Sequence, residues 1–262
     1  PFPPRTDAGT LHRIYRAWRT RIPYENFDLQ LGRPITLDPR KLLDKFGPRR
    51  RGGTCFQMNG ALGVLLRELG FEVSIVEGAV LREKRGDEAW GNHIALLVHL
   101  EGERRLADVG IGDSFLEPLR LVEGPQRQDG AEYRLEHLDT DTWRVHHRPG
   151  GSVPSWDLRT TARTLAEFAG NARQSHPALH RVLVAQHHRD GRELSLRSRV
   201  YAQTGPHGTR QHVIGSRREF VDTLRRLRIQ VADFSTAELD TLWDRTAAQY
   251  HDWLAIQAAS RG

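Results

Sequence analysis

The pattern of apolar and polar residues changes twice along this chain of 262 residues. Over residues 7 to 78, apolar residues recur at helical spacing, most clearly from residue 61 until Gly70 ends the run. Over residues 72 to 158, short runs rich in valine, leucine and aromatic residues alternate with Gly-Asp, Glu-Gly and Pro-Gly-Gly turns, which is typical of strands. The pattern therefore predicts helices followed by a sheet.

A mixed pattern fills the rest of the chain. Residues 161 to 173 predict a connecting helix, because their apolar positions share one helical face. Strands are predicted near residues 193 to 202 and 211 to 214, and closing helices at residues 216 to 228 and 236 to 258. Helices, then a sheet, then a mixed segment together predict the α+β fold class.

The only cysteine, Cys55, lies at the predicted start of a helix. Gly52 and Gly53 let the backbone turn sharply just before it. Unpaired N–H groups and the helix dipole at such an end stabilise a negatively charged thiolate. A lone cysteine is nevertheless more often part of the packing than a nucleophile, so Cys55 alone does not identify an enzyme.

Two strand-like runs downstream carry a histidine and an aspartate. His93 begins the first run and Asp108 interrupts the second, with Glu101 and Gly102 as a predicted hairpin turn between them. That turn places His93 opposite Gly110, and Asp108 becomes its diagonal neighbour on the same face, within reach of a long side chain. A turn shifted by one residue would separate the pair by roughly 13 Å, too far for a hydrogen bond.

Cysteine, histidine and carboxylate in this order are the parts of a thiol enzyme that forms an acyl intermediate. Cys55 would attack a carbonyl as a thiolate, and His93 would take the thiol proton and later activate the second nucleophile. Asp108 would orient the imidazole and stabilise its charged form. Each residue alone has an ordinary structural explanation, but the three together favour catalysis.

The motifs around these residues resemble the arylamine N-acetyltransferase family. Residues 51 to 59 match the signature Arg-Gly-Gly-x-Cys-Phe, then Glu or Gln, one variable residue and Asn, and residues 22 to 26 read Ile-Pro-Tyr-Glu-Asn. The histidine-led strand and an Asp-Val-Gly-x-Gly segment at residues 108 to 112 also match. Further matching positions are Glu167, Phe168, Asn171, Ser175, His176, Pro177, Gly191, Arg192 and Leu194.

This resemblance implies a papain-like cysteine-enzyme core in three domains. Residues 1–78 would form an N-terminal helical bundle with the nucleophilic cysteine. Residues 79–174 would form a central antiparallel β-barrel with a connecting helix, carrying histidine and aspartate, and residues 175–262 an α/β lid. It also implies an ion pair between Glu25 and Arg51, against the alternative of two solvated charges.

The resemblance further implies transfer of an acetyl group from acetyl-CoA, as acyl-donor substrate, to a small arylamine or hydrazine through a Cys55 thioester. Ile111 is a candidate substrate-binding residue, because it matches a position, often aromatic in the family, that lines the acceptor pocket. Phe56, directly after the cysteine, is a second candidate, although it also suits packing. The sequence does not name the residues that hold coenzyme A, the amine, the acyl length or the oligomeric state.

Other functions share the same triad. Relatives of the family take an acyl chain from a carrier protein and pass it to an aromatic amine, and Ile111 keeps this amide synthase alternative open. A papain-like amidase would transfer the acyl group to water instead. A non-catalytic binding protein that retains the fold is a third alternative.

Composition excludes several other classes. The net charge is +6, almost all of it from arginine, which suits phosphate groups such as those of coenzyme A but also simple solubility. Because no helix carries a basic stripe interleaved with aromatic residues, we expect no nucleic-acid partner. Because the chain shows neither an apolar leader nor a membrane-length run, we expect no membrane partner.

Cysteine and histidine usage adds two expectations. A single cysteine excludes an intramolecular disulfide framework and suits the reducing cytoplasm. The pairs His146-His147 and His187-His188 lack the partner spacing of a zinc site, so we expect surface histidines and no metal.

Overall fold

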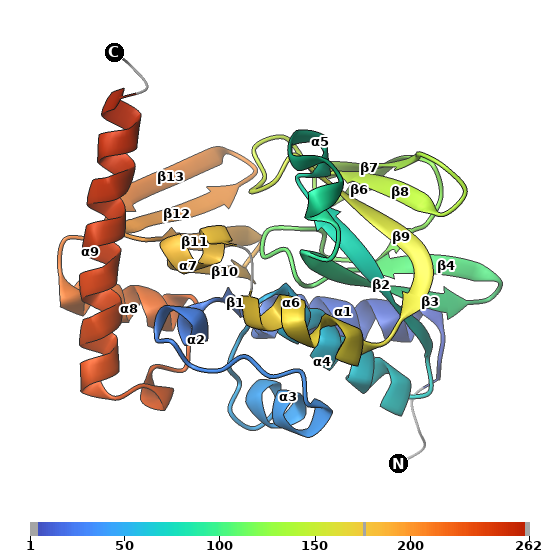
Figure 1. Cartoon of the computed structure of the whole chain (residues 1–262), viewed down its shortest axis with the longest axis horizontal. Helices are drawn as coiled ribbons and strands as arrows, with labels where there is room; N and C mark the ends of the chain where they lie inside the picture. The colour runs from blue at the N-terminus through green and yellow to red at the C-terminus, as the bar shows by residue number, and fades with distance from the viewer. Residues whose placement is uncertain (1–4, 175–176, 260–262) are drawn as a thin grey trace.

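The computed structural model describes residues 5–174 and 177–259 (Figure 1). The predictions made for the first four residues, Ser175 and His176 lie outside the described residues. The helices are α1 (Ala8–Arg21), α2 (Phe27–Gln30), α3 (Pro39–Phe46), α4 (Cys55–Glu68), α5 (Arg82–Arg85), α6 (Ala169–Gln174), α7 (Pro177–Arg181), α8 (Arg217–Arg226) and α9 (Thr236–Ala259). The strands are β1 (Tyr24–Glu25), β2 (Glu72–Val80), β3 (His93–Leu100), β4 (Glu103–Ala107), β5 (Leu119–Arg120), β6 (Gly124–Gln128), β7 (Ala131–His137), β8 (Thr142–His146), β9 (Ser155–Arg163), β10 (Val184–Arg189), β11 (Arg192–Arg197), β12 (Val200–Gly205) and β13 (Gly208–Val213).

The larger sheet is antiparallel and curls into a nearly closed barrel, with strand order β5-β4-β3-β2-β9-β8-β7-β6. Two glutamine side chains of the edge strand β6 bind backbone groups of the other edge strand, β5, and of the segment before it. Gln126 binds both backbone polar groups of Arg120, at 2.9 and 2.8 Å. The Gln128 amide oxygen accepts from the N–H groups of Leu116 and Glu117, and its nitrogen donates to the Glu117 carbonyl at 2.7 Å. These bonds satisfy backbone groups that an open sheet edge leaves unpaired.

The smaller sheet has strand order β1-β10-β11-β12-β13, so β1, which precedes the cysteine helix, joins strands from the C-terminal third. Figure 1 places the barrel on the right, this sheet with α8 and α9 on the left, and α1, α4 and α6 below. One core extends from the N-terminal helices into the barrel, and a second joins the smaller sheet to α8 and α9.

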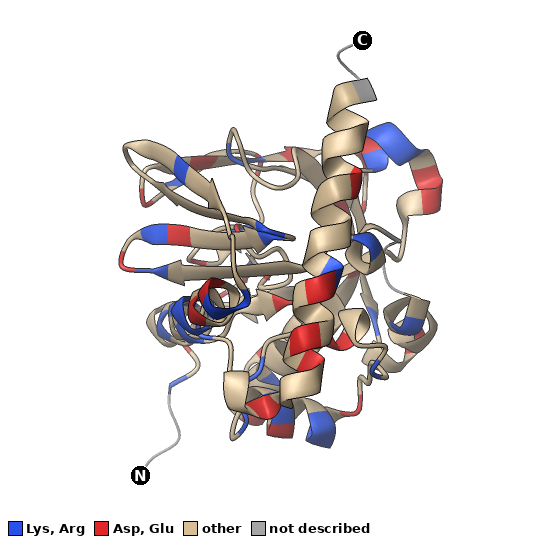
Figure 2. Ribbon diagram, turned by 90° about the vertical axis from the view of Figure 1, so that its left-hand side faces the viewer, with Lys and Arg blue, Asp and Glu red and all other residues tan. Residues whose placement is uncertain are grey.

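The long helix α9 continues beyond the sheet that it packs against (Figures 1 and 2). Its last turns expose Trp253, Leu254 and Ile256, and Figure 2 shows few charged residues there. Among residues 5–174 and 177–259, no helix combines the length and hydropathy that a transmembrane span requires.

The predicted connecting helix over residues 161 to 173 is wrong in its first part. Strand β9 continues through Arg163, because Ala162 and Arg163 pair with Val76 and Ile75 of β2. Helical structure starts only at Leu165, after Thr164 and Glu167 form a reciprocal capping box. Sheet pairing therefore outweighed the helical spacing of the apolar residues.

Strand β10 was not predicted, and the strand expected over residues 193 to 202 is two strands. Residues 184 to 187 of β10 are all buried, so they lack the alternation that marks a half-exposed strand. Ser198, at a φ of 49°, lies in the turn that separates β11 from β12. The two closing helices, by contrast, are confirmed as α8 and α9.

The α+β fold class, with a helical N-terminal part, an antiparallel barrel and an α/β C-terminal part, is confirmed. The domain boundaries after residues 78 and 174 stay a prediction. Strand β2 crosses the first of them, and β1 belongs to the smaller sheet.

The barrel seam gives a test of stability. We expect Gln128→Ala to lower the free energy of unfolding by about 1–3 kcal/mol, because three backbone groups lose their partner. Urea denaturation followed by circular dichroism measures the change. Gln211→Ala, at an exposed position of the edge strand β13, is the control. Equal stability of the two variants would contradict a closing role for Gln128.

Candidate active site

Cys55 is the first residue of α4 and is 6% exposed. Thr54 precedes it in an extended conformation. A Cβ on Gly52 would lie 2.1 Å from the Pro23 carbonyl oxygen, and one on Gly53 would meet Gln57 at 2.8 Å. The two glycines therefore allow the backbone before Cys55 to pack closely on its neighbours, and the predicted helix start at the cysteine is confirmed.

His93 and Asp108 are in direct contact, with 2.9 Å between Nε2 of the histidine and Oδ2 of the aspartate. The hairpin turns at Glu101 and Gly102, both at positive φ, and pairs Leu100 with Glu103, as predicted. Both triad side chains are buried, at 1% and 0% exposure. Asp108 follows the end of β4, so its side chain lies beyond the paired region, where it reaches the histidine.

Opposing effects set the protonation of this pair. Burial lowers the pKa of His93, but the Asp108 carboxylate and hydrogen bonds with Asp108 and Cys55 outweigh it and raise the pKa to about 10. Burial raises the pKa of Asp108, yet the His93 charge and hydrogen bonds from His93, Asn59 and Gly110 leave it below its usual value. The geometry thus favours a charged imidazolium beside a carboxylate. Because Asp108 occupies Nε2, the His93 ring is left with Nδ1 for the sulfur.

Asn59 completes the environment of the carboxylate, a role that the sequence pattern did not reveal. It lies four residues after Cys55, on the same face of α4. Its amide nitrogen donates to Asp108 Oδ1 at 2.7 Å and to the Ile94 carbonyl at 2.6 Å. Its oxygen accepts from the Val109 N–H at 2.9 Å. One helix thus carries the sulfur and also clamps the histidine strand to the aspartate loop.

Glycines keep the histidine and the aspartate loop close to Cys55. A Cβ on Gly110 would lie 2.7 Å from Cys55 Cβ, and one on Gly78 would lie 2.9 Å from His93 Cδ2. The His93 ring also packs edge-on against Trp156, with 5.1 Å between ring centroids. These contacts leave the imidazole little freedom to move away from the sulfur and the carboxylate.

The expected ion pair between Glu25 and Arg51 is confirmed, and it is buried. Arg51 Nη2 lies 2.8 Å from Glu25 Oε1 and 3.0 Å from Asp28 Oδ1, and both partners of the first pair are at most 2% exposed. The Arg51 guanidinium also stacks over Phe234, 4.4 Å from the ring centroid. Glu25 accepts a further hydrogen bond from the Phe27 N–H. The pair thus ties the loop before Cys55 to β1 and to the segment before α9.

Both candidate substrate-binding residues are largely buried. Ile111 is 6% exposed and follows Gly110, which packs on Cys55. Phe56 is 2% exposed and packs against Phe168, with 6.3 Å between ring centroids. Contact of either residue with an amine stays a prediction.

The expectation of surface histidines is wrong for His147 and His187, which are buried, and for His188, which is half-buried against Arg19. His147 and His187 are 8% and 1% exposed. His187 pairs with Leu194 on the face of the smaller sheet that packs against the second core, which explains its burial. His146 lies nearer the surface and pairs with Glu136 at 2.7 Å.

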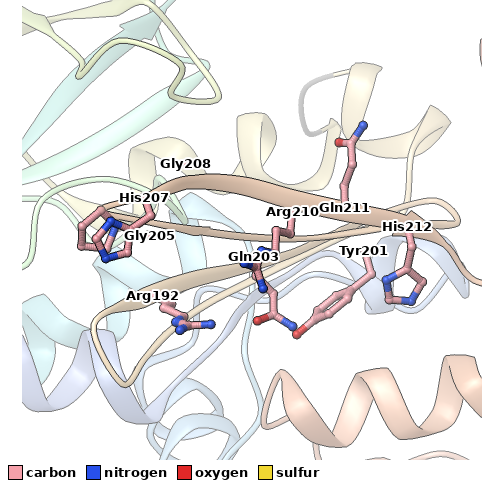
Figure 3. Close-up of a pocket in the computed structure, with 10 residues that line it drawn as sticks. Arg192, Tyr201, Gln203, Gly205, His207, Gly208, Arg210, Gln211 and His212 are labelled. Carbon is pink, nitrogen blue, oxygen red and sulfur yellow. The ribbon is translucent and has the colours of Figure 1, made fainter.

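A hollow of about 300 Å³ opens under the hairpin of β12 and β13 (Figure 3). Arg192, Tyr201, Gln203 and Arg210 line it from one face of the sheet. Gln186, whose side chain lies against Gly112 of the loop after Asp108, points to the opposite face, because residues alternate along a strand. This hollow is therefore separate from the triad.

A cysteine at a helix start that faces a barrel-borne histidine and aspartate is the arrangement of papain-like cysteine enzymes that transfer acyl groups.

Comparison with known proteins gives the family. A family model described as N-acetyltransferase matches residues 7–234. The chain is 35% identical over 211 residues to the arylamine N-acetyltransferase / N-hydroxyarylamine O-acetyltransferase of Salmonella typhimurium, covering 77% of this chain and 72% of the relative. It is 41% identical over 168 residues to the Mycolicibacterium smegmatis arylamine N-acetyltransferase, covering 61% of each. The structure of Mycobacterium marinum arylamine N-acetyltransferase in complex with CoA superposes with a TM-score of 0.83 at 28% identity, covering 93% of this chain and 94% of that one. The chain belongs to the arylamine N-acetyltransferase family.

The raised pKa of His93 predicts a pH-dependent contribution of Asp108 to stability. The folded value of about 10 lies above the unfolded value of about 6.5, so this contribution is complete below about pH 6.5 and is lost as the pH rises toward 10. We expect the loss of unfolding free energy in Asp108→Asn to be larger at pH 6.5 than at pH 9.5, measured by urea denaturation. Asp190→Asn, at an exposed turn, is the control. A loss that grows with pH would contradict this assignment.

Burial of the Glu25–Arg51 ion pair predicts that removing one partner destabilises the protein more than removing both. We expect Arg51→Met to lower the free energy of unfolding by about 3–5 kcal/mol, because Glu25 stays buried without its partner. Arg49→Met, which removes an exposed guanidinium paired with Asp233, should cost under about 1 kcal/mol. Adding Glu25→Leu to Arg51→Met should recover part of the loss. Similar denaturation curves for Arg51→Met and Arg49→Met would refute the role of burial.

Proposed function

We propose that this protein transfers an acetyl group from acetyl-CoA to an arylamine or hydrazine through a thioester on Cys55. The observation that carries the proposal is the buried His93–Asp108 hydrogen bond beside the cysteine at the start of α4. Membership of the arylamine N-acetyltransferase family supports the same reaction. In this proposal the catalytic residues are Cys55, His93 and Asp108.

Two acyl transfers make up the reaction. His93 takes the proton of Cys55, the thiolate attacks the acetyl carbonyl, and the carbon–sulfur bond to coenzyme A breaks. The imidazolium returns its proton to the departing coenzyme A sulfur, which leaves acetyl-Cys55 and neutral His93. His93 then takes a proton from the attacking amine, an amide forms, and the proton returns to Cys55. Asp108 stabilises the imidazolium in both steps.

Coenzyme A as the donor is supported by the Mycobacterium marinum relative, whose structure was solved in complex with CoA. The acceptor is a small molecule, and Ile111 and Phe56 are proposed to line its side of the site. Position 111 is aliphatic here, whereas it is often aromatic in the family. The site therefore also suits acceptors other than flat aromatic amines, or an acyl chain from a carrier protein, as in the amide synthase alternative. The three-domain division belongs to this proposal, with the nucleophile on residues 1–78 and its base on residues 79–174.

A reactive thiol also suits a particular compartment. An oxidised sulfur cannot act as the nucleophile, so we place the protein in the reducing cytoplasm.

Intact-mass measurement after mixing with acetyl-CoA tests the proposal. We expect the wild type to gain one acetyl group and Cys55→Ala to gain none, because the sulfur is the acyl acceptor. Adding aniline or phenylhydrazine should remove the acetyl group and release the acetylated amine. If acetyl-CoA at any concentration leaves the mass unchanged, the acetyltransferase function is wrong. Acylation by an acyl-loaded carrier protein instead would favour the amide synthase.

A further inference from the structure

The loop from Asp108 to Phe115 lies between the nucleophile and the smaller sheet. Gly110 packs on Cys55, where a Cβ would lie 2.8 Å from the cysteine Cα. A Cβ on Gly112 would lie 2.2 Å from Gln186 Oε1 on β10. Ile111 lies between Gly110 and Gly112 in the sequence. The path of the loop between these two contacts therefore decides which side chain faces an acyl group on the sulfur.

One buried arginine from α1 binds three carbonyl groups of this loop. Arg19 Nη1 donates to the Ile111 carbonyl at 2.9 Å. Its Nη2 donates to the carbonyls of Gly112 and Ser114, at 3.1 and 2.8 Å. Arg19 is only 4% exposed, although it lies near the end of its helix. The planar guanidinium therefore holds the loop at several points, which a single ammonium group does not do.

The fourth partner of Arg19 is a histidine of the smaller sheet. Arg19 Nη2 lies 2.8 Å from His188 Nε2. A guanidinium has no acceptor, so Nε2 must accept, and the His188 ring is neutral with its proton on Nδ1. Because Nη2 carries two hydrogens for His188, Gly112 and Ser114, one hydrogen is shared between two acceptors. Burial and the Arg19 charge hold the pKa of His188 well below its usual value, in agreement with a neutral ring. Among the described residues, no carboxylate forms an ion pair with Arg19, so its charge is balanced by carbonyl and imidazole groups.

Helix α1 also holds the other end of the loop. The Tyr15 hydroxyl donates to the Asp108 carbonyl at 2.6 Å. Tyr15 and Arg19 are four residues apart, so they lie on one face of the helix. The Asp108 carboxylate, however, is held separately by Asn59, His93 and the Gly110 N–H. Removing Arg19 therefore frees the Ile111 portion of the loop while the triad keeps its own contacts.

We propose that Arg19 is a positioning residue for the second half of the reaction, fixing the Ile111 loop beside acetylated Cys55 for amine attack. The inference rests on the proposed function and goes beyond it, because it assigns acceptor placement to a helix outside the triad. Arg19 touches neither the sulfur nor the triad side chains in any contact of the described residues. Its effect runs through the carbonyls of Ile111, Gly112 and Ser114 and through His188.

The two half-reactions give a readout that a purely structural role would not change. Stopped-flow measurement of coenzyme A release gives the rate of acetyl-Cys55 formation, and its decay on adding aniline or phenylhydrazine gives the second step. Partial unfolding lowers the amount of active enzyme but not the ratio of the two rate constants. We expect Arg19→Met to slow the second step at subsaturating amine by about tenfold, with acetyl-Cys55 formation within about twofold of wild type.

Conservative and control variants sharpen the test. Arg19→Lys should recover part of the second step, because an ammonium group reaches fewer of the carbonyls. His188→Gln should remain close to wild type, because the amide oxygen can accept from Arg19. The matched control is Arg16→Met on the same helix, which removes a half-exposed guanidinium paired with Glu117 and Asp129. It should leave both steps unchanged.

The outcomes separate this inference from the proposed function. In one outcome, the wild type forms acetyl-Cys55 and acetylates the amine, and the ratio of the two rate constants is the same in Arg19→Met and Arg16→Met. This outcome overturns the role of Arg19 and leaves the acetyltransferase function intact. Equal slowing of both steps in Arg19→Met also overturns it, because the arginine would then support the whole site. Wild type that never acetylates Cys55 refutes the proposed function itself, and the inference with it.

Discussion

The architecture of this protein depends on how one buried carboxylate is satisfied. Asp108 is fully buried, and a buried charge is tolerated only when charge and hydrogen bonds compensate its desolvation. Its partners come from different parts of the chain: His93 at the start of β3, Asn59 from the middle of α4, and the Gly110 N–H of its own loop. The carboxylate therefore joins the cysteine helix to the barrel, and any loss of packing between them exposes an unpaired charge.

Close approach is the second constraint on the site. Gly52, Gly53, Gly78, Gly110 and Gly112 all lie where a Cβ would meet a neighbouring atom at less than 3.0 Å. Interiors pack densely, so these contacts leave no room for a larger side chain. The glycines allow a helix start, a strand and a loop to meet around Cys55, and this close packing adds rigidity to that of the polar contacts around Asp108.

Arginines hold the outer parts of the site in place. Arg51 is balanced by carboxylates and joins the loop before Cys55 to β1. Arg19 is balanced by carbonyls and a neutral histidine, and joins α1 to the loop after Asp108 and to β10. Both guanidiniums are buried, so they act as fixed cross-links between chain segments rather than as mobile surface charges.

Local sequence determined the helix start at Cys55, the two-residue turn that brings His93 toward Asp108, and the α+β class. Each depends on residues that are close in sequence or on a short antiparallel register, where spacing alone sets the geometry. Tertiary structure decided the rest. Asn59 reaches an aspartate 49 positions away, and Arg19 binds a carbonyl 92 positions away. The extension of β9, the burial of His187 and the barrel seam at Gln128 likewise depend on which elements pack together, because backbone pairing and desolvation across the fold outweigh local preference.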